Sequence, residues 1–81
     1  MAVNRTNDEE FENSQKKYNE AKEIYFRLRM LFDSSNFKEV ERIYNSLSEE
    51  QKTELENVMQ DAIFIEPIAS KLMKYVKERR N

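Results

Sequence analysis

The chain has 81 residues, with 16 acidic and 14 basic side chains that give a net charge of −2. A chain of this length forms one small domain, whose core buries only about 60 to 65% of the surface of the unfolded chain. It has no cysteine and no histidine, which excludes disulfides, thiolate metal sites and histidine-based catalysis.

Glycine is also absent, and there is a single proline. Hairpin turns, strand bulges and phosphate-binding loops mostly rely on glycine, whereas long helices avoid both residues. The apolar residues recur at helical spacing, which is too regular for a disordered chain. The sequence therefore predicts an all-α fold.

The first predicted helix begins near Thr6 or Asn7 and runs to about residue 32. Thr6 is followed three residues later by Glu9, which is the spacing of a capping box. An apolar seam for burial then alternates steps of four and three, with Ser14 as its polar interruption. Its members are Phe11, Tyr18, Ala21, Tyr25, Leu28 and Phe32.

A polar turn is expected at residues 33–36, where short side chains can bond free backbone groups. A short second helix follows at about residues 37–47. Ser48 and Gln51 have the spacing of a second capping box and start the third helix.

The third helix carries a seam that keeps its register past Pro67. Proline removes one backbone hydrogen bond and crowds the preceding turn, so a kink is expected there. One kinked helix is the simplest prediction, and a break into two helices is the alternative. The seam residues are Leu55, Val58, Ala62, Ile65, Ala69, Leu72 and Val76.

These elements predict a small bundle of two long antiparallel amphipathic helices plus one short connecting helix, with the third helix kinked or broken at Pro67. Residues 1–81 are expected to form one domain, with residues 1–5 and 79–81 frayed. A core of this size supplies only about 3 to 5 kcal/mol. Self-association is the expected further source of stability, because no disulfide or cysteine–histidine metal site can form.

The composition argues against an enzyme. Nucleophilic catalysis usually needs a histidine base, and carboxylate catalysis needs a deep cleft that a few short helices seldom enclose. Without glycine, the familiar nucleotide-binding loops and the EF-hand loop cannot form. Glutamates one turn apart, such as Glu20 and Glu23, are better explained as solvated faces than as metal ligands. We expect no catalytic residue, no cofactor and no metal.

No targeting segment is visible in the sequence. A cationic start followed by a long apolar run is missing near Met1, and the longest apolar stretch spans only residues 62–65. The sequence therefore predicts neither a secretion signal nor a membrane span. The cytoplasm is the default location, and the lack of cysteine fits a reducing compartment.

The charges are distributed unevenly along the chain. Residues 39–66 carry eight acidic and two basic side chains, whereas residues 67–81 carry five basic and one acidic. The basic run fits a solvated helix C-terminus, but it also offers contacts for phosphate or for an acidic partner, including the acidic segment of a second copy. Nucleic acid is the lesser alternative, because the chain as a whole is acidic. The residues concerned are Lys71, Lys74, Lys77, Arg79 and Arg80.

Two apolar clusters, at residues 24–32 and 62–68, exceed what one buried helix face can hold. Either the second helix covers one of them within a compact domain, or they form an interface. Aromatic residues, methionine and arginine are enriched where proteins meet. The candidate partner-binding residues are Phe26, Arg29, Met30, Phe64 and Ile68.

The leading interpretation is a small non-enzymatic module, an inhibitor or regulator that docks on a larger protein through an exposed aromatic and methionine patch. The alternatives are a self-assembling helical bundle, either a homodimer or a higher homo-oligomer, and a nucleic-acid-binding accessory protein that uses the basic C-terminal helix. The composition is similar to that of small inhibitors and regulators of bacteria and their phages, although no motif supports that similarity.

Overall fold

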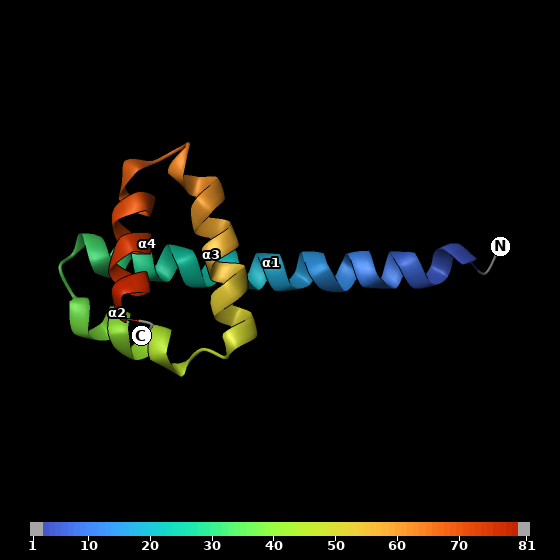
Figure 1. The fold of residues 1–81 in the computed structure, drawn as a ribbon, viewed down its shortest axis with the longest axis horizontal. Coiled ribbons are helices and arrows are strands. Elements are labelled where there is room, and N and C mark those ends of the chain that lie inside the picture. Colours follow the sequence, from blue (N-terminus) through green and yellow to red (C-terminus); the bar gives the residue numbers. More distant parts are fainter. Residues whose placement is uncertain (1–2, 80–81) are drawn as a thin grey trace.

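The computed structural model describes residues 3–79, with side chains from residue 12 onward. Within this range the chain forms helices and no strand, which confirms the all-α prediction. The helices are α1 (Val3–Asp33), α2 (Phe37–Ser46), α3 (Glu49–Ile63) and α4 (Pro67–Arg79) (Figure 1).

The helices form two hairpins that cross each other (Figure 1). The short α2 turns back along the C-terminal half of α1, and the α3–α4 hairpin packs across that half. The N-terminal half of α1 extends past the other three helices, so the molecule measures 52 × 26 × 19 Å. Two long antiparallel helices with a short connector do not describe this arrangement, because the predicted third helix is divided into α3 and α4.

The division lies immediately before Pro67, so the predicted alternative of a break into two helices is confirmed and one continuous kinked helix is wrong. Proline disfavours helical geometry in the residue before it, but its fixed φ suits the first position of a new helix. Accordingly, α3 ends at Ile63, and Glu66 accepts the first hydrogen bond of α4 from the backbone N–H of Ala69 at 3.2 Å. The break lets both halves of the seam turn inward on antiparallel helices.

The start of α3 is as predicted. The Ser48 hydroxyl accepts a hydrogen bond from the Gln51 backbone N–H at 3.1 Å, and the Gln51 side chain accepts one from the Ser48 N–H at 2.8 Å. The start of α1 is not as predicted, because the helix begins at Val3 and already includes Thr6. The side chains of Thr6 and Glu9 lie outside the described residues.

The end of α1 is closed by a turn that usually contains glycine. Ser35 has φ of 60°, and the N–H groups of Ser35 and Asn36 donate to the carbonyls of Phe32 and Leu31 at 3.0 and 2.8 Å. This is the Schellman pattern, which satisfies the last free carbonyls of a helix. For a residue with a Cβ, such as Ser35, this left-handed conformation is less stable than the right-handed one by about 1 kcal/mol or more.

The core contains residues from all four helices and lies where the two hairpins cross. Most of the predicted seams are in it, including Tyr25 and Leu28 of α1 and Leu55 and Leu72 of the two halves of the divided helix. Phe11 belongs to the predicted seam, but its side chain lies outside the described residues. The buried apolar residues are Ala21, Tyr25, Leu28, Val40, Tyr44, Leu55, Val58, Met59, Ala69, Leu72, Met73 and Val76.

One end of the core is closed by three aromatic rings, which we call the aromatic end. Phe32 of α1, Phe37 of α2 and Tyr75 of α4 have ring centroids 5.3 to 5.5 Å apart. The guanidinium of Arg79 lies over the Tyr75 ring at 3.6 Å and pairs with Glu41 of α2. Contacts from three helices therefore meet at this end.

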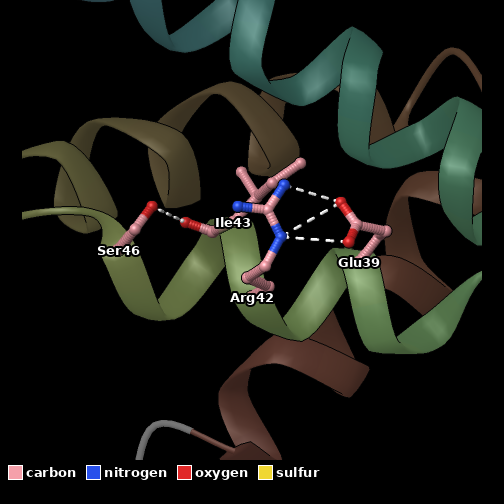
Figure 2. Close-up of polar contacts among 4 residues, drawn as sticks. All are labelled: Glu39, Arg42, Ile43 and Ser46. Atoms are coloured by element: carbon pink, nitrogen blue, oxygen red, sulfur yellow. Dashed lines mark hydrogen bonds and ion pairs between the residues drawn. The ribbon is translucent and has the colours of Figure 1, made fainter.

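Two polar contacts on the outside of α2 lie within the helix itself (Figure 2). Arg42 donates to Glu39 through Nε and Nη2, at 3.0 and 2.7 Å, and the Ser46 hydroxyl donates to the Ile43 carbonyl at 2.6 Å. Arg42 and Glu39 thus pair with each other, whereas Ser46 bonds the backbone of its own helix. Val40 and Tyr44 are the fully buried side chains of this helix.

Candidate protein-binding surface

Large apolar side chains are exposed in two places that α2 does not cover. On α1, Phe26 is 45% and Met30 66% exposed, and at the α3–α4 turn Phe64 is 91% and Ile65 84% exposed. Within residues 12–79, Phe37 is the other large hydrophobic side chain that is exposed, at 42%, and its ring packs into the aromatic end. Helix α2 packs instead on another side of α1, where Ile43 lies beside Ile24.

The exposed residues of α1 lie beside the α3–α4 turn. One open groove runs between Phe26 and Ile65, and a second runs between Met30 and Ile68. Glu66 lines both grooves and therefore lies between them. We call this surface the turn patch, defined by Phe26, Arg29, Met30, Phe64, Ile65 and Ile68.

The turn patch is held in place by three polar side chains at its centre. The Tyr25 hydroxyl donates to Glu66 Oε1 at 2.8 Å, and Arg29 Nη1 donates to Glu66 Oε1 and Oε2 at 2.9 and 2.7 Å. Tyr25 is buried, whereas Arg29 and Glu66 keep about a third and a quarter of their side-chain surface exposed. The residue before Pro67 thus fastens the α3–α4 turn to α1.

The contacts in this cluster shift the pKa values of Glu66 and Tyr25. The hydrogen bond from Tyr25, together with the bond and charge of Arg29, lowers the pKa of Glu66 below its usual 4.5. The pKa of the Tyr25 hydroxyl is raised mainly by burial and, to a smaller extent, by its hydrogen bond to Glu66. Glu66 is therefore ionised and Tyr25 neutral at neutral pH, which is the combination that these hydrogen bonds require.

The structure brings together most of the residues that the sequence singled out. Phe26, Arg29 and Met30 share the turn patch with half-buried Ile68, and Phe64 lies in the adjoining turn. The prediction that Ile65 lies in the buried seam is wrong, because α3 ends two residues before it and leaves its side chain exposed. Pro67 was the feature of the sequence that could have predicted the exposure of Ile65, because helices usually end at or before the residue that precedes a proline.

The sequence-based candidates did not include Glu66, which holds the centre of the turn patch. Tyr25 and Arg29 are one turn apart on α1, so they can share a partner. Nothing local in the sequence, however, indicates an acidic group about 40 positions later. The contact exists only because the chain folds back at Pro67.

The basic C-terminal run is divided by the fold. Lys71, Lys74 and Lys77 are exposed, but Arg79 pairs with Glu41 and covers Tyr75. Arg80 lies outside the described residues. The prediction grouped all five cations as one possible contact surface. Arg79 instead pairs with Glu41 and joins α4 to α2.

Within the described part of the chain, no group of three or more acidic, histidine or cysteine side chains is placed to hold a metal ion. No helix between residues 3 and 79 is both long and apolar enough to cross a membrane. Comparisons with protein-family models, curated proteins and solved structures find no match. Function is therefore inferred from the geometry of the surface.

Proposed function

We propose that this chain is a small protein-binding module, an inhibitor or regulator that docks on a larger protein through the turn patch. The observation that carries the proposal is the exposure of four large apolar side chains at and beside the α3–α4 turn, namely Phe26, Met30, Phe64 and Ile65. Single exposed apolar residues are ordinary, but a group of them on a monomer marks an interaction site.

The patch has the composition of an interface centre. Aromatic residues, methionine and arginine are enriched in such centres, and large apolar anchors account for most of the binding energy. Phe64 and Ile65 project from a turn that Glu66 ties to α1. Fixing the anchors before binding reduces the entropy lost on association.

The charges around the patch fit a role in orientation. Arg29 and Glu66 neutralise each other within it, while Lys22 and Asp61 border the groove beside Phe26. Charges at the rim of an interface affect association rate and partner choice more than affinity. The larger partner would therefore present an apolar pocket with a polar border.

The proposal is tested with a double variant at the turn, Phe64→Ala with Ile65→Ala. Immobilised wild-type protein is exposed to a lysate of the source cells, and a protein that it retains is purified. Titration calorimetry with that partner should then show affinity reduced about tenfold or more. Asn45→Ala, at an exposed position of α2, is the matched control and should bind as the wild type does.

The stability of the variant separates a lost contact from a lost fold. Both side chains are more than four-fifths exposed, so the free energy of unfolding should change by no more than about 0.5 kcal/mol. A purified partner that binds the double variant as tightly as the wild type would contradict the proposal.

Nucleic acid binding has less support than protein binding. Three lysines of α4 are free to meet phosphate, but Arg79 is held by Glu41. Three neutralised phosphates give a weak contact that is easily lost in salt.

A further inference from the structure

One exposed face of α1 has an ordered arrangement of charge and apolar surface, which we call the α1 stripe. It consists of Lys22, Phe26, Met30 and Asp33, all exposed. Spacings of four and three keep these residues on one side of a helix. The stripe begins with a cation, ends with an anion and has two large apolar side chains between them.

The two charged ends have no ion-pair partner within the described part of the chain. The described ion pairs of α1 use Lys17, which meets Glu50, and Arg29, which meets Glu66. Asp33 and Lys22 lie 11 residues apart, which is about 16 Å along the helix. Opposite charges at the two ends of an apolar strip are an arrangement that can complement itself.

We propose that a second copy of this chain docks on the α1 stripe, with the two α1 helices antiparallel across a two-fold axis. A two-fold interface applies the same surface twice, so each contact is made in duplicate. Lys22 of each copy then faces Asp33 of the other, and Phe26 and Met30 are enclosed between the two ion pairs.

The register of this pairing satisfies the charged and the apolar residues together. When Lys22 lies opposite Asp33 of the second copy, Phe26 lies within one residue of Met30 of that copy. A parallel arrangement would instead place lysine beside lysine and aspartate beside aspartate, which is unfavourable. The order of charges therefore selects the antiparallel pairing.

The surroundings of the stripe favour the same occupant. Ile65 and Ile68 form the far sides of the grooves beside Phe26 and Met30, and so offer apolar walls to the side chains of the second copy. Arg29 is held against Glu66, so it adds no unpaired positive charge near Lys22 of the second copy. The apolar contact supplies affinity, and the ion pairs set direction and register.

This inference does not depend on the proposed function. The dimer is tested by sedimentation equilibrium of variants at Lys22 and Asp33. Partner binding is tested by calorimetry of a variant at Phe64 and Ile65, so either proposal can fail without the other. A second copy on the stripe covers Phe26 and Met30, so it would compete with a partner that needs those two side chains.

The test uses sedimentation equilibrium of Lys22→Glu, Asp33→Lys and their mixture. The wild type should show a monomer–dimer equilibrium over a roughly hundredfold concentration range. Each variant alone places like charges at both ends of its dimer, so its dissociation constant should rise roughly tenfold or more. An equimolar mixture should recover wild-type affinity, because the mixed dimer has one lysine–aspartate pair and one glutamate–lysine pair.

Arg27→Glu is the matched control, since Arg27 is an exposed cation on the same helix but off the stripe. It should dimerise as the wild type does, and all variants should keep the circular dichroism spectrum of the wild type. A wild type that stays monomeric throughout would overturn the inference. So would a dimer whose affinity is unchanged in both single variants, or a mixture that associates no better than its components.

Discussion

The aromatic end and the turn patch contain similar residues, yet the chain uses them in opposite ways. At the aromatic end, Phe32, Phe37 and Tyr75 come from three helices and pack against one another. At the turn patch, Phe26 and Phe64 remain exposed, and the elements are joined by the polar contacts of Glu66. Aromatic composition alone does not distinguish a packed cluster from an exposed one.

The difference lies in what covers each region. Helix α2 is only ten residues long and packs at the aromatic end, where Phe37, its first residue, closes the cluster. No described element lies over the outer side of the α3–α4 turn, where Phe64 and Ile65 are largely exposed. Ring packing therefore stabilises the aromatic end, with the Arg79–Glu41 ion pair at its edge. The turn patch is instead held by the hydrogen bonds and ion pair of Glu66.

The largest expected effect comes from opening the aromatic end. Phe32→Ala removes a half-buried ring that contacts both other rings, so it should reduce the free energy of unfolding by about 2 kcal/mol or more. Urea denaturation followed by circular dichroism measures this change. Phe26→Ala removes a comparable ring from the turn patch and serves as the comparison. Equal losses in the two variants would mean that the regions do not differ in this way.

A smaller fall in stability is expected when the polar centre of the turn patch loses its charge. Glu66→Gln removes the ionised acceptor shared by Tyr25 and Arg29, and it should lower Tm at neutral pH by less than Phe32→Ala does. The folded pKa of Glu66 lies below its usual value of 4.5. Its contribution is thus complete above about pH 4.5 and is lost as pH falls through the folded pKa.

The pH dependence provides the control for that variant. The difference in Tm between wild type and Glu66→Gln should be constant near neutrality and should shrink as the solution is acidified below pH 4.5. Other carboxylates, such as Glu41, titrate in both proteins, so their effects cancel in the difference. A difference that does not change with pH would contradict a role for the Glu66 charge.

The smallest predicted effect is a gain in stability beside the aromatic end. Ser35 has a positive φ in the turn between α1 and α2, where glycine has no steric cost. Ser35→Gly should therefore raise the free energy of unfolding by about 1 kcal/mol, less the entropy that glycine adds to the unfolded chain. Thermal and urea denaturation both measure it. Ser35→Ala keeps the Cβ and should give no gain, so equal stabilisation by both substitutions would contradict the explanation.

Local features of the sequence predicted the all-helical class and two of the helix boundaries. The Ser48–Gln51 capping box depends on residues three positions apart, and the polar turn at 33–36 lies between two clear apolar repeats. Most of the core followed from the same repeats, since Tyr25, Leu28, Leu55 and Leu72 are buried as expected. Four of the candidate partner-binding residues, Phe26, Arg29, Met30 and Ile68, lie together, although their role remains a proposal.

The break at Pro67 shows why periodicity has limits. The seam of α3 continues in register into α4, because both helices bury a face with the same repeat, and a repeat does not record whether the chain turns back. The local restriction that proline places on Glu66 was the better guide. Ile65 was predicted to be buried because it continues the apolar repeat. The repeat no longer predicts burial there, because α3 ends at Ile63.

The sequence by itself therefore determined the helical class, most of the buried faces and the capped start of α3, because hydrogen bonding and amphipathic spacing act over a few residues. Only the tertiary structure decided that Glu66 meets Tyr25 and Arg29, that α2 covers one side of α1 and leaves Phe26 and Met30 exposed, and that Arg79 joins α4 to α2. These contacts link residues up to about 40 positions apart. Their partners are chosen by how the two hairpins cross, which no short segment of the chain specifies.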